Sequence, residues 1–270
     1  MKSGYITSGS QQLHYLEWGH GKQVLLCFHG YGNQAGLFAS LANHLLDDYT
    51  ILSFDLPYHG NSRWNGSQPW QPSELVNTVQ SILQERQVPK VSLLCFSIGG
   101  RIGLTLAGLM PEQIDRLVLL APDGLTSNAF YSFVTRNPAG KRLFAHFLNK
   151  PNGYIKLMDW LQQNKMLDAT KKSFITHYIS SPSARMMLKN VWPNLRLIVP
   201  QQGKVKRAIN RYKIPTHLFM GRYDQVIPLK NAYVFAKGVP GIKVHVLEKG
   251  HRLLDDAKVI HDVVQILRVR

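Results

Sequence analysis

The sequence has little cysteine and lacks any long apolar run. Cys27 and Cys95 are the only cysteines among 270 residues, and both lie inside apolar, strand-like segments. We expect two buried, reduced thiols, which argues against a disulfide-stapled scaffold or a cysteine metal site and favours a cytoplasmic protein. No transmembrane helix is expected, and the N-terminus lacks the charged start and apolar stretch of a signal peptide.

Acidic residues are also scarce. The chain holds 16 Asp and Glu against 32 Lys and Arg, a net charge of +16. Most of this excess lies in residues 125–213, where sixteen cations face two acids, a local charge of about +14. The composition, 44% hydrophobic and 18% charged, is typical of a globular protein and not of a disordered one. The length suits one large domain, or one domain with an insertion.

Short apolar runs alternate with helix-length segments on both sides of that basic region. After a strand-like pair in residues 1–19, we expect strands within residues 23–30, 49–57, 90–97, 114–122, 214–221 and 241–250. Helices are expected over residues 72–86, 98–109, 228–237 and 252–268. Alternation of this kind predicts an α/β fold with a mostly parallel, doubly wound sheet that is covered on both faces.

The basic region has a different pattern. It contains short amphipathic stretches, such as KRLFAHFL and ARMMLKNVW, separated by Asn, Pro, Gly and Ser. We therefore predict a core domain from residues 1–124 and 214–270, with a basic helical cap inserted at residues 125–213. Large apolar side chains at helical spacing are expected mostly inside this cap: Phe144, Phe147, Trp160, Phe174, Tyr178, Met186, Met187 and Trp192.

The run VSLLCFSIGG, residues 91–100, breaks at Ser97. A nucleophilic serine on a sharp strand-to-helix turn usually lies in the pattern G-x-S-x-G, because small neighbours let the backbone fold back. Here Cys95 stands in place of the first glycine and Gly99 keeps the second. The alternative is a serine that merely caps a helix after a buried strand.

A nucleophilic serine needs a base, and the base needs an acid that orients it. Asp224, in GRYDQVIP, lies just beyond one expected strand, and His251, in KGH, lies just beyond the next. Groups at the carboxyl ends of parallel strands converge on one edge of the sheet. Ser97, Asp224 and His251 follow one another along the chain in the order in which one large hydrolase fold carries its nucleophile, acid and base.

With these pieces in place, the chain resembles the α/β-hydrolase superfamily, in its serine-nucleophile branch with a helical cap. The resemblance rests on FHGYG, FDLPYHGNS, CFSIGG, GRYDQVIP and KGH, in the family's order over about 225 residues. It implies that Ser97 is the nucleophile, His251 the general base and then acid, and Asp224 its orienting acid. The backbone amides of Tyr31 and Ile98 would form the oxyanion hole.

The resemblance implies a hydrolase that cleaves a carboxylic ester or related acyl bond through an acyl-serine intermediate, with no metal or organic cofactor. Two alternatives stay open: a carbon–carbon bond hydrolase of the same fold, and a non-catalytic binding protein that keeps the fold. Asp123, which ends another expected strand, is a candidate substitute acid. We expect structural hydrogen-bonding roles for His29 and His59.

The excess of positive charge in residues 125–213 bears on what the protein can bind. It can steer a small, anionic acyl substrate toward the site or dock on an anionic membrane surface, or it can simply present solvated helix faces. We do not expect nucleic acid as a partner, because no motif that reads nucleic acid is visible.

Overall fold

The computed structural model describes residues 1–64, 68–164, 176, 179 and 181–269. The chain divides into two compact units. The core unit comprises Met1–Ser127 and Leu197–Arg270, and the helical unit comprises Asn128–Arg196. In the described part of the chain, no helix has both the length and the apolar character needed to cross a membrane.

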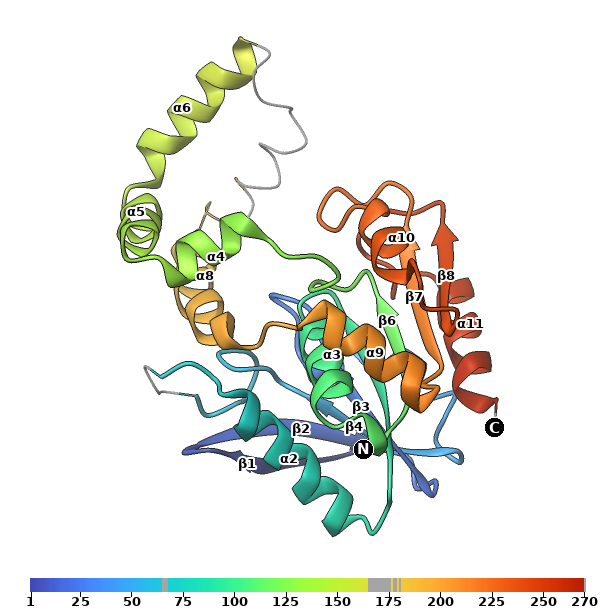
Figure 1. Cartoon of the computed structure of the whole chain (residues 1–270). Helices are drawn as coiled ribbons and strands as arrows, with labels where there is room; N and C mark the ends of the chain where they lie inside the picture. The colour runs from blue at the N-terminus through green and yellow to red at the C-terminus, as the bar shows by residue number, and fades with distance from the viewer. Residues whose placement is uncertain (65–67, 165–175, 177–178, 180, 270) are drawn as a thin grey trace. The chain divides into compact units, whose positions relative to one another are not determined.

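The core unit is built on an eight-stranded sheet with the order β1-β2-β4-β3-β5-β6-β7-β8 (Figure 1). The strands are β1 (Lys2–Ser8), β2 (Gln11–Trp18), β3 (Gln23–Phe28), β4 (Tyr49–Phe54), β5 (Val91–Phe96), β6 (Ile114–Leu120), β7 (Thr216–Gly221) and β8 (Ile242–Leu247). β2 runs antiparallel to β1 and β4, and every other neighbouring pair is parallel. The expected strands and the mostly parallel α/β sheet are confirmed.

Helices cover both faces of this sheet. They are α1 (Ala39–Ala42), α2 (Pro72–Glu85), α3 (Gly99–Leu109), α9 (Gln202–Tyr212), α10 (Lys230–Ala236) and α11 (Ala257–Arg268), with short 3-10 turns η1 (Ala35–Phe38) and η2 (Pro111–Gln113). A third 3-10 turn, η3 (Leu195–Leu197), includes the residue at which the chain passes from the helical unit back to the core unit. On one face, Cys27 packs in an apolar layer with residues of α1 and α11, such as Leu41 and Val263. On the other face, Cys95 lies against α3. Both thiols are free and buried, as expected.

The helical unit contains α4 (Ala129–Arg136), α5 (Pro138–Asn149), α6 (Pro151–Gln163) and α8 (Pro182–Asn194). Trp192 of α8 stacks on Phe144 of α5, and its carbonyl accepts a hydrogen bond from the Tyr131 hydroxyl of α4. These two apolar side chains therefore pack inside the unit as predicted. Trp160 and Met186 do not, since they are 54% and 57% exposed. Phe174 and Tyr178 lie outside the described residues.

The boundary of the inserted segment differs from the expected one at its C-terminal end. The sequence prediction places residues up to 213 in the cap, whereas α9 belongs to the core unit. α9 buries Val205 and Ile209, and Val205 lies against Gly108 of α3. Composition misplaces this helix because its exposed face is as basic as the insertion that precedes it.

Candidate active site

Ser97 lies in a strained turn between β5 and α3. Its φ of 50° is in the left-handed region that L-residues rarely adopt, and it is 9% exposed. Three backbone hydrogen bonds hold the turn. The Ser97 amide donates to the Leu120 carbonyl at 2.9 Å, and the Ser97 carbonyl accepts from the amides of Gly100 and Asp123, each at 2.8 Å. Such strain persists only where the surroundings over-determine it, and it is typical of functional sites.

Two glycines make this turn possible. A Cβ on Gly99 would lie 2.1 Å from the carbonyl oxygen of Phe28, so only glycine permits this close approach. A Cβ on Gly103 would lie 2.6 Å from the Cys95 sulfur. Gly103 therefore provides the room for Cys95, the residue that departs from the usual pattern. Burial raises the pKa of the Cys95 thiol, so this side chain stays a neutral packing group.

Asp224 and His251 complete a hydrogen-bonded chain that ends at Ser97. Asp224 is 5% exposed and follows β7. One carboxylate oxygen accepts from the amides of Val226 and Ile227 at 2.8 and 2.9 Å. The other lies 2.7 Å from His251 Nδ1, while His251 Nε2 lies 2.9 Å from Ser97 Oγ.

The proton positions follow from this geometry. An ionised carboxylate only accepts, so His251 Nδ1 carries the proton, and neutral Nε2 is left to accept from the Ser97 hydroxyl. The loop of His251 is tied to that of Asp224, because the Tyr223 amide donates to the Lys249 carbonyl at 2.9 Å. The Phe96 ring lies 5.2 Å from the imidazole. The arrangement can therefore remove a proton from Ser97 and return it to a leaving group.

Asp123 has a different partner. Arg101 Nε donates to one of its carboxylate oxygens at 2.5 Å, and the Gly124 amide donates to the other at 2.7 Å. This carboxylate fastens the turn after β6 to α3, directly behind Ser97. The position beside His251 is occupied by Asp224.

The two expected oxyanion donors follow neighbouring parallel strands. Tyr31 lies in a tight turn after β3, in which the Asn33 amide donates to the Gly30 carbonyl at 3.1 Å. Ile98 directly precedes α3, at a helix start, where backbone amides have no acceptor within the helix. Since β3 and β5 are adjacent and parallel, both residues lie at the carboxyl edge of the sheet with Ser97.

Sequence reasoning missed Asp55, which links three segments at this edge. Its carboxylate accepts from the amides of Ala35 and Asn61 at 2.6 and 2.9 Å and lies 2.8 Å from His14 Nδ1. Asp55 directly follows the buried strand β4, and Asp224 likewise comes soon after the end of β7. Its position after a strand could have marked Asp55 as a candidate, but it does not reveal which groups Asp55 hydrogen-bonds.

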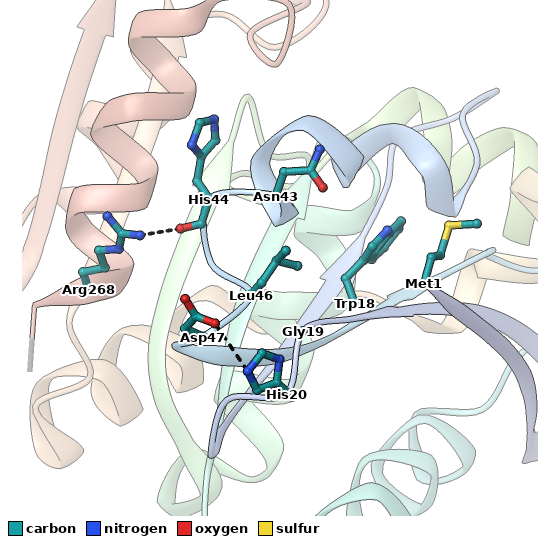
Figure 2. Close-up of a pocket in the computed structure, with 9 residues that line it drawn as sticks. All are labelled: Met1, Trp18, Gly19, His20, Asn43, His44, Leu46, Asp47 and Arg268. Carbon is teal, nitrogen blue, oxygen red and sulfur yellow. Dashed lines mark hydrogen bonds and ion pairs between the residues drawn. The ribbon is translucent and has the colours of Figure 1, made fainter.

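The described residues also form an open cavity of about 730 Å³ at the other edge of the sheet. Figure 2 shows Trp18, Leu46 and paired His20 and Asp47 among its lining residues. Leu46 and Asp47 lie just before β4, so the cavity lies at the amino ends of the parallel strands, away from Ser97. Among the described residues, no cluster of three or more His, Cys, Asp or Glu side chains could hold a metal ion.

Comparison with known proteins bears on the family and the fold. Residues 23–258 match a family model described as the alpha/beta hydrolase fold. The hydrolase YugF of Bacillus subtilis is 26% identical over 213 residues, covering 78% of this chain and 76% of YugF. An esterase from Thermogutta terrifontis has a TM-score of 0.69 at 16% identity, with coverage of 99% and 97%. The 2-hydroxy-6-oxo-6-phenylhexa-2,4-dienoate hydrolase of Rhodococcus sp. strain RHA1 has a TM-score of 0.67 at 19% identity, covering 98% of both chains.

Proposed function

The chain belongs to the alpha/beta hydrolase family, and on that premise we propose that it is a serine hydrolase that cleaves a carboxylic ester or a related acyl bond. The observation that carries this proposal is the continuous chain of hydrogen bonds from Asp224 through His251 to Ser97. A serine that only caps a helix has no need of a buried acid and base in line with its hydroxyl.

In the proposed first half-reaction, Ser97 Oγ attacks the acyl carbon while His251 Nε2 takes the hydroxyl proton. The carbonyl electrons move onto the substrate oxygen, which the amides of Tyr31 and Ile98 would bind. As the intermediate collapses, the bond to the leaving group breaks and His251 gives it the proton. Asp224 stays ionised throughout and stabilises the imidazolium that forms.

The second half-reaction repeats these steps with water. His251 takes a proton from water, the hydroxide adds to the acyl-Ser97 carbon, and the bond to Ser97 Oγ breaks. The proton returns to Ser97 and the carboxylic acid leaves. Each step uses residues of this chain and water alone.

A carbon–carbon bond hydrolase is a second candidate. The Rhodococcus dienoate hydrolase has the same fold at 19% identity, so the fold is compatible with this reaction as well. The same three residues would serve, with a carbon atom next to a carbonyl group as the leaving group that takes the proton from His251. The two functions thus differ in the substrate and not in the relay.

The proposed partner is a small acyl substrate, with anionic acyl compounds favoured by the net charge of +16. A positive potential raises the local concentration of anions, which increases their rate of capture. The proposal favours this substrate over an anionic membrane surface and over nucleic acid as the partner of the basic residues.

The proposal is tested with a series of p-nitrophenyl esters, from acetate to palmitate, on wild type and Ser97→Ala. We expect hydrolysis in wild type and its loss in the variant, with the best chain length reporting the size of the acyl pocket. A fluorophosphonate probe should label wild type at Ser97. Labelling without ester hydrolysis would favour the carbon–carbon hydrolase, and the absence of both would favour a binding protein.

A further inference from the structure

His59 lies beneath the turn that carries Tyr31. The Gly32 amide, the next along the chain from that of Tyr31, donates to His59 Nε2 at 3.1 Å. The Tyr31 ring meets the imidazole edge-on, with centroids 6.1 Å apart and planes at 88°. A residue 27 positions away in the sequence thus holds both a backbone amide and a side chain of this turn.

The tautomer of His59 is determined by its two neighbours. Nε2 accepts from the Gly32 amide and therefore carries no proton. Nδ1 lies 2.9 Å from the Pro57 carbonyl, which accepts only, so the single ring proton is on Nδ1. Burial lowers the pKa of His59 below its ordinary value, which keeps the ring neutral and Nε2 available as an acceptor.

The segment around His59 is built to hold this ring in place. His59 is 2% exposed, and the His29 ring packs against it with centroids 4.9 Å apart. The preceding residue, Tyr58, has a φ of 63°, a conformation that is strained for a bulky side chain. Asp55 ties the segment down from the other end through the Asn61 amide. Strain of this kind requires compensation by the surroundings, and here it directs one imidazole at the Gly32 amide.

We propose that His59 is a positioning residue for the oxyanion hole. By accepting the hydrogen bond from the Gly32 amide, it fixes the turn so that the Tyr31 amide points at the substrate oxygen. This inference rests on the proposed function, because it assigns His59 to the same site. His59 would not touch the substrate. Its effect would be felt in the transition state, where the oxygen carries its charge, and not in substrate binding.

The test compares His59→Leu with His59→Gln. The glutamine amide oxygen can take the place of Nε2 and accept from Gly32, whereas leucine fills the space without an acceptor. We expect His59→Leu to lower kcat about 10²-fold with KM unchanged, near the lower end of the cost of losing one oxyanion donor. His59→Gln should recover about tenfold or more of that loss. His217→Gln, at a half-buried histidine in β7, is the control for the substitution itself and should keep wild-type kcat.

A second measurement does not depend on activity. Exchange of the Gly32 amide hydrogen should be about tenfold or more faster in His59→Leu than in wild type, and slower again in His59→Gln. Equal exchange in all three proteins, or equal loss of kcat in both His59 variants at unchanged melting temperature, would overturn the positioning role. If wild type neither hydrolyses esters nor labels with the probe, the proposed function fails, and the exchange measurement still decides how His59 holds the turn.

Discussion

Replacement of Asp224 by asparagine probes the proposed relay with the smallest change in shape. In wild type, one carboxylate oxygen accepts two backbone amides and the other faces His251 Nδ1 at 2.7 Å. If the asparagine oxygen still accepts the hydrogen bonds from the Val226 and Ile227 amides, the asparagine NH2 group points at His251 Nδ1 and donates to it. His251 must then accept at Nδ1 and carry its proton on Nε2, which faces Ser97.

In this tautomer, Nε2 can no longer accept the proton of the Ser97 hydroxyl. We expect kcat to fall about 10⁴-fold, the loss seen when a triad histidine is held in the wrong tautomer, which corresponds to about 5.4 kcal/mol in the barrier. KM should change little, because the substrate does not touch Asp224 in the proposed mechanism. The assay is steady-state hydrolysis of the best p-nitrophenyl ester, together with the rate of fluorophosphonate labelling.

The control for this experiment is Asp123→Asn, at the other carboxylate near Ser97. Asp123 pairs with Arg101, so its loss should lower the melting temperature while kcat stays much closer to wild type than in Asp224→Asn. A kcat for Asp224→Asn within about tenfold of wild type would refute the tautomer argument. Loss of activity in Asp123→Asn alone would move the orienting role to Asp123.

Three further predictions follow from the packing, the histidines and the charge. Gly103→Ala should lower the free energy of unfolding in urea by about 1–3 kcal/mol, because its Cβ meets the Cys95 sulfur, and the double variant with Cys95→Gly should recover most of this loss. Burial lowers the pKa of His29 to about 3 and that of His217 to about 4. Below about pH 6.5, the unfolded chain therefore binds more protons than the folded one. The melting temperature should accordingly fall as the pH is lowered from about 6.5 to about 4. His217→Gln should make that fall shallower, and an unchanged slope would contradict the argument. Added salt should slow hydrolysis of anionic esters more than that of neutral ones, and equal slowing would exclude electrostatic steering.

Local sequence pattern was sufficient for much of the fold. Continuous apolar runs predicted the inner parallel strands β3, β4, β5 and β6, because strands buried on both faces admit few polar residues. Once the order of strands was known, the ends of β5, β7 and β8 placed Ser97, Asp224 and His251 at one edge. The hydrogen-bond distances among them are a finding of the structure.

The sequence could not assign a helix to its unit when helices of both units share the same pattern and composition. α9 is basic and amphipathic like the inserted helices, and only its packing on α3 assigns it to the core unit. The room for the Cys95 side chain depends on Gly103, which lies eight positions later in the chain, in the helix α3 that packs against β5.

The sequence by itself determined the strand–helix alternation and the order of the candidate catalytic residues, since both depend on the spacing of residue types along the chain. Only the tertiary structure decided which side chains support them. His59 reaches Gly32, and Asp55 reaches Ala35 and His14, through loops whose backbone conformations include strained residues such as Tyr58. A hydrogen bond requires a distance and a direction between two groups, and these are defined only after distant segments have packed together.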